Sequence, residues 1–481
     1  MISTLLISFG LVAQSPVPTG PVRLSLQDAI RTSLEKNLQV QVAVETRNFS
    51  QANVQISQGA FDWTLNGAAS YGHSKSTFDN KVFQIGTPAV SGSNTSDSRN
   101  LSLGVLKPFE WGGTFSMNYN PTYQSNATNR TGFPSSVTLT PYTGILSASY
   151  TQSLLKGFGR QVAEANVIVA KKGAIAADYQ FQKSIIDLVA STETLYWGVV
   201  SAQRNLENKQ QALTLAQKQL KENRIRVEVG TLAPIEVTSA EAAEAQRQQD
   251  IIKAEADFAN AKDALLRSLY PSTTRPESLE LTDSPTLSHI TTDEKSAEKM
   301  ALERRVELKT ARLDLESKQI LEGVSRNRLK PQLDLKLAYN GNAADYDTFS
   351  PVNSDLWQAK NPGYNVGLTF SMPLPNRAAK GSMAQARANL RSSELTLRDL
   401  ELGIALEVRT ALRDVDSMEK GVKAAEKTRI FRAKDLEAEQ KKYENGMSTN
   451  FLVLSKQDVL DSAKSAELQS QISYAKAVTT L

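Results

Sequence analysis

The chain carries two copies of one pattern, and each copy combines alternating strand segments with helical segments too long for a compact globular domain. Near the N-terminus matched residues lie 268 positions apart, as in Ala29 and Ala297. Toward the C-terminus the spacing falls to 216, as in Gly230 and Gly446. Duplication of one unit is the economical explanation. The change in spacing predicts about 52 extra residues in the first copy, around 73–160.

Composition excludes several classes of site and partner. The 481 residues are 40% apolar and 22% charged, and no run of about 18 apolar residues is present, so we expect no transmembrane helix. Cysteine is absent, which excludes disulfides, thiolate metal sites, cysteine nucleophiles and a lipidated N-terminal cysteine. The net charge is +4, and no basic block is interleaved with aromatic residues. We therefore expect no nucleic-acid partner.

The first residues resemble a secretory signal. Ile2 to Ala13 forms a short apolar run, and cleavage after Ala13 is plausible because a small residue stands there. A basic segment before this run is missing, since the first positive side chain is Arg23. Either the true start lies elsewhere or the segment has another role. The pattern predicts export.

Four segments alternate between apolar and polar residues with the period of a β-strand. They are residues 62–71, 146–151, 333–340 and 363–375. Any one of these segments alone could belong to a soluble β-sandwich in which one face of each sheet is exposed to solvent. Their length of about 10 residues, the aromatics near their ends and the Ser-, Asn- and Gly-rich loops together favour an outer-membrane barrel. Four strands are too few to close a barrel, which needs about eight, so we expect copies of the chain to share one.

Two long segments are typical of helices. Residues 163–233 contain no proline, and neither does the chain from Asn376 to its end. At 1.5 Å per residue, each run of about 60 or more residues would extend about 90–100 Å. Both are rich in Ala, Leu, Glu, Lys, Gln and Arg, which favours long helices packed as coiled coils.

A short turn interrupts each helical run at matching points, residues 229–237 and 445–453. Gly230 and Gly446 suit the position after a helix C-terminus, where positive φ is required. The residues that suit the start of the following helix are Thr231 with Pro234 and Ser448 with Thr449. Each copy is therefore predicted to end in a helical hairpin.

This layout resembles the outer-membrane efflux protein family, the TolC-like channel-tunnels. The resemblance extends from about Leu24 to the end of the chain and depends on the two glycine tips, on residues 26–30 with Asn37, and on residues 304–308. It implies a mixed α and β fold: a homotrimer in which about four strands per protomer form a shared β-barrel in the outer membrane, continued by a periplasmic α-helical barrel. It further implies passive export of small molecules or proteins in a tripartite efflux or type I secretion system. The partners implied are outer-membrane lipid, a periplasmic adaptor (membrane fusion) protein and an inner-membrane pump of the RND, ABC or MFS type.

The corresponding domain organisation has two structural repeats. A signal peptide and tail occupy 1–20, the first repeat 21–270, a linker 271–295 and the second repeat 296–481. The finer divisions are an extra hairpin at about 98–125, barrel strands of the second repeat at about 331–375, and tips at 229–238 and 445–455.

The extra hairpin falls within the 52-residue excess, where two alternating segments flank Glu110-Trp111-Gly112-Gly113. It is either an appendage on the barrel or two further membrane strands, giving six per protomer. The repeat supplies only four strands, so we favour the appendage.

The resemblance also implies roles for the tips, which contact the adaptor and close the tunnel in that family. Glu236 and Tyr443 match positions where a carboxylate and a tyrosine hydrogen-bond across the gate, although Glu236 could equally favour its helix N-terminus electrostatically. Leu452 and Ser455 stand where some members have aspartates, which makes an acidic ring doubtful and suggests an apolar plug at Leu452. The adaptor-contacting residues implied are Gly230, Thr231, Leu232, Ala233, Pro234, Gly446, Met447, Ser448 and Thr449.

Catalysis has little support. His73 and His289 have no second ligand at metal spacing, and the glycines of residues 156–160 lack the spacing of a phosphate loop. We expect no enzyme activity, no cofactor and no metal site. The alternative to a channel is a soluble periplasmic coiled-coil adaptor or structural protein with a β domain, which has no reason to carry lipid-type strands in both repeats.

Overall fold

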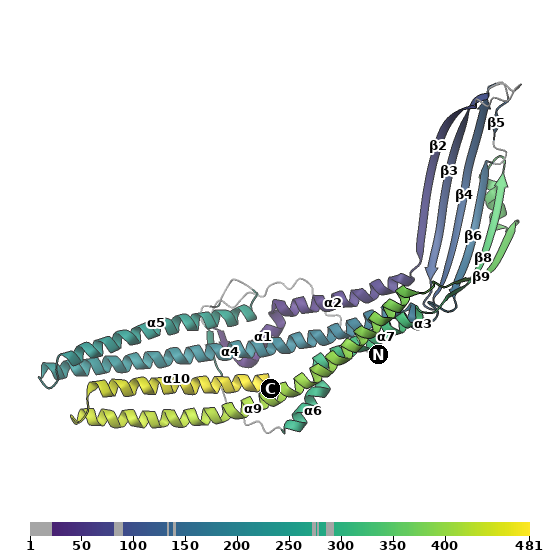
Figure 1. The fold of residues 1–481 in the computed structure, drawn as a ribbon. Helices are drawn as coiled ribbons and strands as arrows, with labels where there is room; N and C mark the ends of the chain where they lie inside the picture. Colours follow the sequence, from purple (N-terminus) through teal and green to yellow (C-terminus); the bar gives the residue numbers. More distant parts are fainter. Residues whose placement is uncertain are drawn as a thin grey trace. The chain divides into compact units, whose positions relative to one another are not determined.

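The computed structural model describes residues 22–80, 90–131, 134–137, 141–271, 276, 279–284 and 293–481. The expected signal segment, most of the expected linker and His289 lie outside these residues. The chain divides into two compact units (Figure 1). The first comprises Met1–Arg47, Asp178–Lys309 and Arg398–Leu481, and the second comprises Asn48–Ala177 and Thr310–Leu397.

The second unit contains a sheet with six long antiparallel strands. They are β2 (Thr64–Asn80), β3 (Val90–Pro108), β4 (Gly113–Arg130), β6 (Tyr142–Ser153), β8 (Gln332–Asp345) and β9 (Pro362–Ser371), hydrogen-bonded in that order. The short β5 (Ser136–Val137) pairs with β4. The connection from β8 to β9 contains a short helix, α8 (Phe349–Trp357). β2 and β9 are the two edges of this sheet.

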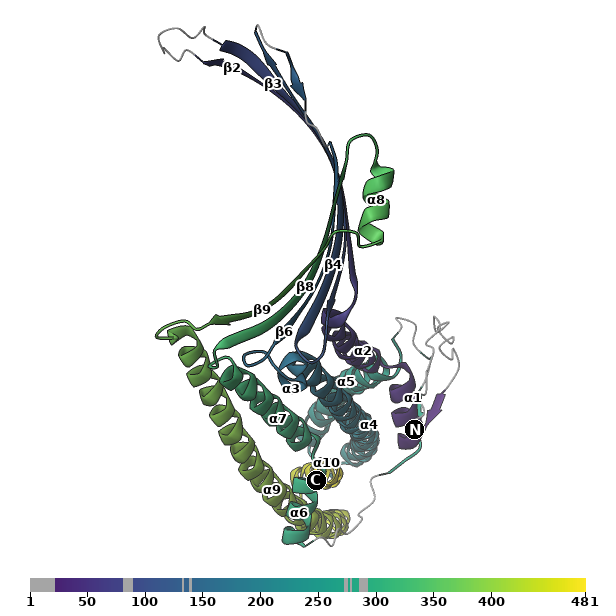
Figure 2. The ribbon, with the colours of Figure 1, turned by 90° about the vertical axis from the view of Figure 1, so that its right-hand side faces the viewer.

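One face of the sheet is apolar on all six strands. Strand registry aligns the alternating positions, for example Leu65 with Val105 and Leu337 with Val366. The face therefore contains Leu65, Leu103, Met117, Leu146, Leu337 and Val366, whereas the other contains Asn66, Ser102, Asn118, Ser147, Lys336 and Asn365. Figure 2 shows that the strands bow along their length and that α8 lies on the convex side. An apolar outer face and a polar inner face are typical of a membrane barrel.

The extra hairpin belongs to the sheet, so the preference for an appendage and for about four strands per protomer was wrong. β3 is hydrogen-bonded to β2 along one side and to β4 along the other, and β4 continues to β6. The inserted strands keep the same alternation as their neighbours and therefore extend both faces without interruption. The prediction counted only the duplicated strands as part of the sheet. It was wrong because inserted strands can pair in the middle of a sheet as well as at its edge.

Long helices lead away from the sheet at its Trp63 end. α4 (Ala165–Glu228) has 64 residues and α9 (Arg377–Glu444) has 68, which corresponds to about 100 Å each. Shorter helices precede the strands in both halves of the chain: α2 (Leu38–Gln58), followed by the 3-10 turn η1 (Gly59–Phe61), and α7 (Val306–Asn327). The single-turn helix α3 (Arg160–Ala163) precedes α4.

The first unit contains the ends of the long helices and the two hairpins. α4 is followed by α5 (Ile235–Leu269) and α9 by α10 (Asn450–Thr480), while α1 (Leu26–Lys36) and α6 (Glu294–Arg304) are shorter. The strands β1 (Val22–Leu24) and β7 (Leu279–Leu281) pair in parallel. These strands border a hydrophobic core that includes Tyr196. Tyr196 is fully buried, and its hydroxyl donates a hydrogen bond to the Leu24 carbonyl at 3.1 Å.

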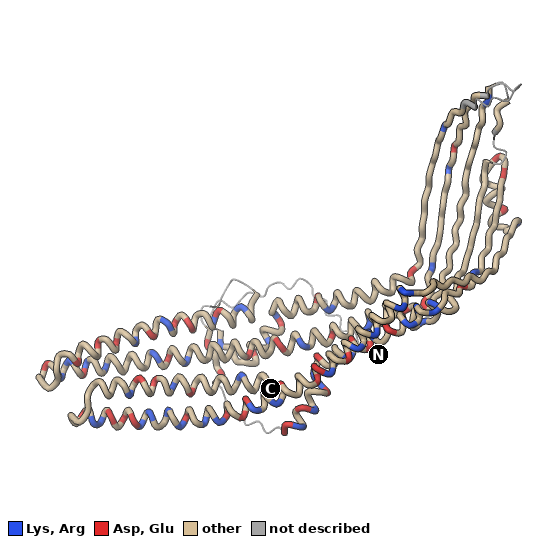
Figure 3. Tube along the Cα trace, in the orientation of Figure 1, with Lys and Arg blue, Asp and Glu red and all other residues tan. Residues whose placement is uncertain are grey.

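Charges are interspersed along the long helices and sparse on the strands (Figure 3). Some ion pairs of the helices join two exposed side chains, such as Arg224 with Glu241, which is typical of solvated helix faces. Within the described ranges, none of the helices combines the length and the apolar content that crossing a membrane requires.

Candidate functional site

The first tip joins α4 to α5 through a glycine-capped turn. Gly230 has φ of 79°, a left-handed conformation that other residues rarely adopt, as its position predicted. Its N–H donates to the Val227 carbonyl at 3.0 Å, and the Thr231 N–H donates to the Arg226 carbonyl at 2.9 Å. These two bonds form a Schellman motif that satisfies the last carbonyls of α4.

The second tip repeats this geometry with different side chains. Gly446 has φ of 73°, and its N–H donates to the Tyr443 carbonyl at 3.1 Å. The Met447 N–H donates to the Lys442 carbonyl at 2.8 Å. Thr449 then caps α10 by accepting from the Leu452 N–H, as expected from its position. Both tips therefore share one backbone design, and both lie at the same end of the first unit (Figure 1).

Large apolar side chains are exposed at both tips. In the first tip, Val229 is 72% exposed and Ile235 is 65% exposed. In the second, Met447 and Phe451 are 70% and 73% exposed. The predicted contact residues Thr231, Ala233, Pro234 and Thr449 are also exposed, whereas Leu232 and Ser448 are half-buried. Clustered apolar groups rimmed by polar residues are typical of a surface that binds another protein.

A buried polar contact joins the two hairpins just inside the tips. The Tyr443 hydroxyl on α9 donates to Oδ1 of Asn223 on α4 at 3.0 Å. The same oxygen accepts from Nε2 of Gln219 at 3.0 Å, and Nδ2 of Asn223 donates to the backbone carbonyl of Glu236 at 3.5 Å. Asn223 is fully buried and Tyr443 nearly so. We call Gln219, Asn223 and Tyr443 the inter-hairpin clasp.

The clasp differs from the expected Glu236–Tyr443 bond. Asn223 receives the single hydroxyl proton of Tyr443, and Glu236 takes part through its backbone carbonyl rather than its carboxylate. Burial raises the pKa of the Tyr443 hydroxyl, and the Arg226 guanidinium, 4.5 Å from the ring centre, acts in the opposite direction. The hydroxyl therefore stays protonated and able to donate.

A buried carboxylate lies near the second tip. Glu439 is 7% exposed, accepts from the Ser448 hydroxyl, and also accepts from the Lys442 ammonium at 3.3 Å. The Ser448 hydrogen bond holds the pKa of the Glu439 carboxyl below its ordinary value against the opposing effect of burial, and Lys442 adds to this lowering. The second tip is thus tied to α9 by a charge-assisted bond.

The predicted gate residues Leu452 and Ser455 lie on the first turns of α10. Leu452 is 42% exposed, and Ser455 is half-buried. Between them, Val453 is fully buried and packs with Tyr443 and Leu460. Within one protomer, Leu452 therefore points away from the packed core and is available for contact with another surface.

An ionic cluster joins the hairpins farther along. Arg247 on α5 contacts Asp458 and also Asp461 on α10, the latter at 3.5 Å, and Lys209 on α4 contacts Asp250 at 3.4 Å. The Arg247 and Asp461 side chains are only 13% and 12% exposed. Burial raises the pKa of the Asp461 carboxyl, and Arg247 offsets part of this effect.

Comparison with known proteins identifies the family. The sequence profile described as "Outer membrane efflux protein" matches residues 122–269 and 298–481, which is more than half of the chain. The chain belongs to the outer membrane efflux protein family. Efflux across the outer membrane is therefore its function, and of the two functions considered from the sequence, the channel is the one that membership supports. The family is one of channels rather than of enzymes. Among curated proteins, none matches this chain in sequence.

Solved structures share the fold of this efflux protein. The outer membrane protein VceC from Vibrio cholerae aligns with a TM-score of 0.66 at 16% identity, covering 95% of this chain and 94% of the other. The CmeC outer membrane channel of Campylobacter jejuni gives 0.66 and 16%, covering 95% and 84%. A membrane protein from Pseudomonas aeruginosa gives 0.69 and 16%, covering 95% and 92%.

Sequence reasoning missed most partners of the predicted residues in this efflux protein. Asn223, Gln219, Glu439 and Arg247 were not singled out. A signal for two of them was present, because Gln219 and Asn223 continue the line of small buried residues Ala212 and Ala216 on α4. Polar residues on the packing face of a helix require buried partners, and this spacing could have identified the clasp.

Of the two histidines, His73 is the one within the described residues. His73 lies on β2 with Nδ1 2.7 Å from Oδ1 of Asp97 on β3. The described residues contain no group of three or more histidine or acidic side chains arranged to hold a metal ion.

Proposed function

We propose that three copies of the chain form one export channel, in which the sheets close a shared barrel and the long helices form a periplasmic tunnel. The observation that carries this proposal is the six-stranded open sheet with an apolar outer face. Its edge strands β2 and β9 have unpaired backbone groups on one side, which cannot remain unpaired in lipid. Six strands are also fewer than the eight or so that the smallest barrels need.

Pairing of β9 with β2 of the next copy would remove both edges. Six long strands from each of three copies give a barrel of eighteen, an even number as in bacterial outer-membrane barrels. The trimer itself comes from the resemblance to the channel-tunnel family. The two-repeat organisation, with repeats at 21–270 and 296–481, remains part of the proposal, supported by the identical caps of the two tips.

The tips are proposed as the gate and as the surface that the adaptor binds. In the closed form the clasp holds α9 against α4, Glu439 holds the second tip, and Leu452 of each copy plugs the centre. Asn450, at the start of α10, is 1% exposed, and its amide lacks a hydrogen-bond partner among the described residues. A buried unsatisfied amide is costly, which supports a second arrangement of this tip.

The adaptor would bind the exposed apolar residues of the tips and so shift the gate toward the open form. A periplasmic adaptor and an inner-membrane pump of the RND, ABC or MFS type complete the proposed system. The proposed conduit is passive, as the resemblance to the channel-tunnel family implies, and the inner-membrane pump supplies the energy for export.

Fractionation of the producing cell tests the proposal. The outer-membrane fraction is run on SDS electrophoresis with and without heating, and the purified protein is then placed in planar bilayers. We expect a trimer band that disappears on heating and a discrete single-channel conductance. A soluble monomer or dimer that is indifferent to heating would contradict the proposal and favour the adaptor alternative.

A further inference from the structure

The helix α8 is packed firmly onto the apolar face of the sheet. Val352 and Leu356 are each 1% exposed and pack against Leu146 and Ala343. A Cβ at Gly144 would lie 2.7 Å from Leu356 Cδ1 and 2.8 Å from Val352 Cγ1, so a larger residue there would displace these two side chains. The glycine therefore allows α8 to pack closely on the strand.

Polar and aromatic contacts hold the same helix at its sides. Oδ1 of Asn353 accepts from the Tyr119 hydroxyl at 2.9 Å and from Trp357 Nε1 at 3.2 Å. The Phe349 ring lies 4.9 Å from that of Tyr142, edge to face. These contacts of α8 with β4 and β6 therefore lie on the apolar face, which the membrane would cover in the proposed barrel.

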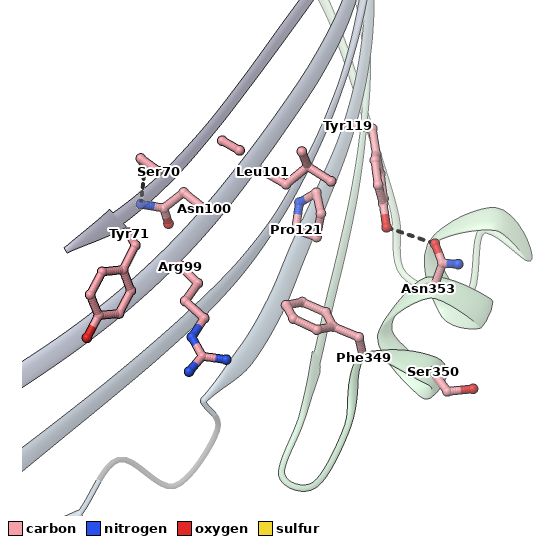
Figure 4. A pocket seen from close by; sticks show the side chains of 11 residues that line it. Ser70, Tyr71, Arg99, Asn100, Leu101, Tyr119, Pro121, Phe349, Ser350 and Asn353 are labelled. Carbon is pink, nitrogen blue, oxygen red and sulfur yellow. Dashed lines mark hydrogen bonds between the residues drawn. The ribbon is translucent and has the colours of Figure 1, made fainter. Parts of the chain in front are cut away.

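A groove of about 910 Å³ lies beside α8 on this face (Figure 4). Its lining includes the apolar groups of Leu101, Tyr119, Pro121 and Phe349, and Tyr71 and Arg99 stand at one end. This volume is within the range of small-molecule sites. Among its lining residues Arg99 is the one with a charged side chain.

Strand registry places Arg99 at the level of lipid headgroups. Arg99 pairs with Tyr71 on β2 and with Tyr123 on β4, and its guanidinium lies 5.5 Å from the centre of the Tyr123 ring. A second aromatic row, with Trp63 and Phe115, stands eight residues back along the strands. Counted with both ends, Trp63 to Tyr71 is nine residues, which matches the 9–11 residues of a membrane-spanning strand. Outer-membrane barrels have an aromatic girdle at each end of this span.

Charge complementarity determines the ligand class. The carboxylates of β3 and α8 have other partners among the described residues. Oδ1 of Asp97, on the same strand as Arg99, lies 2.7 Å from Nδ1 of His73. Asp355 of α8 forms an ion pair with Lys360. The structure gives Arg99 no ion pair of its own among the described residues. A guanidinium at this level suits a phosphate, which it binds in fork geometry.

We propose that the groove between α8 and strands β2 to β4 binds a phosphorylated glycolipid of the outer leaflet. One acyl chain would lie along Leu101, Pro121 and Phe349, and a phosphate would bind Arg99. The outer leaflet follows because, of the two aromatic rows, the row of Arg99 lies farther along β2 from η1 and α2, whereas the row of Trp63 adjoins η1. The inference rests on the proposed barrel, because only that arrangement exposes this face to lipid.

Native mass spectrometry of the trimer in mild detergent tests the site, with bis-phosphorylated lipid A as the probe. The variants are Arg99→Gln, which removes the charge, and Leu101→Trp, which fills the groove. Lys336→Gln is the matched control, since it removes an exposed cation from the opposite face of the same sheet. Loss of a charge-assisted phosphate contact should weaken binding about 10-fold or more.

We expect lipid A to bind equally to wild type and to Lys336→Gln. Its binding to Arg99→Gln and to Leu101→Trp should be weaker. Dephosphorylated lipid A should bind wild type more weakly than lipid A does. Equal binding to Arg99→Gln and wild type would overturn the site, as would an equal loss in Lys336→Gln. Phosphatidylglycerol bound as tightly as lipid A would overturn the glycolipid assignment. If the protein forms a heat-sensitive trimer with normal conductance but the groove variants bind lipid A as wild type does, only this inference is wrong. If no trimer forms, the proposed barrel and this inference are both wrong.

Discussion

Replacing Asn223 with alanine should shift the gate toward its open form, because the substitution removes the centre of the inter-hairpin clasp. In the closed arrangement it leaves the Tyr443 hydroxyl and the Gln219 amide without their common acceptor. A buried polar group without a partner costs about 1–3 kcal/mol. In the open arrangement both groups meet water, so the cost falls on the closed form alone. With two such groups the cost to the closed form is about 2–6 kcal/mol, so the closed-to-open ratio should fall about 30-fold or more for each copy of the chain.

Tyr443→Phe should have a smaller effect in the same direction. The Asn223 oxygen retains its bond from Gln219, so only one hydrogen bond is lost, at about 0.5–1.5 kcal/mol. Glu236→Gln should have no effect, because the clasp uses the backbone carbonyl of Glu236. The order of effects is therefore Asn223→Ala, then Tyr443→Phe, then Glu236→Gln.

Single-channel conductance and open probability in planar bilayers measure this order. Gln217→Ala is the matched control, since it removes a side-chain amide from the same helix at an exposed contact with Glu244. If Asn223→Ala behaves like Gln217→Ala, the clasp does not hold the gate. If Glu236→Gln opens the channel as strongly as Asn223→Ala, the carboxylate is the gating group after all.

Three further predictions concern the sheet, the second tip and the ionic cluster. Deletion of residues 98–125 should abolish the heat-sensitive trimer band, because β3 and β4 lie inside the sheet; a normal trimer would mean that the hairpin is dispensable. The bonded Glu439 carboxylate has a lowered pKa, so its contribution to stability is present above its ordinary pKa of 4.5 and is lost as the pH falls through the lowered value. The protection factors of backbone amides at the second tip, which compare exchange with the intrinsic rate at each pH, should therefore fall as the pH falls below 4.5, and Ser448→Ala should weaken this dependence; equal pH profiles of protection would contradict it. Arg247→Gln should lower the free energy of unfolding in urea by about 3–5 kcal/mol because it leaves Asp461 buried and unpaired, whereas the exposed Arg224→Gln should cost at most about 1 kcal/mol; similar losses would refute the difference.

Local features of this fold could be predicted from the sequence. Gly230 and Gly446 determine where α4 and α9 end, because a left-handed residue is required there and glycine adopts it without strain. The alternation at 363–371 gave β9, since a period of two places its apolar residues on one face. Both signals depend on residues that are neighbours in the chain.

Features that depend on distant partners were missed or only partly predicted. The alternation of β3 and β4 was visible, but their place between β2 and β6 depends on which strands pair, and local pattern does not encode that choice. To predict the clasp, one would need to know which face of α4 packs against α9. The residue that contacts Tyr443 is Asn223, which stands 13 residues before Glu236, the partner expected from the sequence. Helix α8 contains Pro351 and several polar residues, and the surface on which it packs, at Gly144, is distant in the sequence.

The insertion of β3 and β4 has a consequence for what can leave the cell. The diameter of a barrel grows roughly in proportion to its number of strands, so a wall of eighteen would be about one and a half times as wide as a wall of twelve. Barrels of this size enclose an aqueous passage that side chains do not fill. Cargo selection by size would then fall to the tips, if they form the proposed gate, rather than to the barrel.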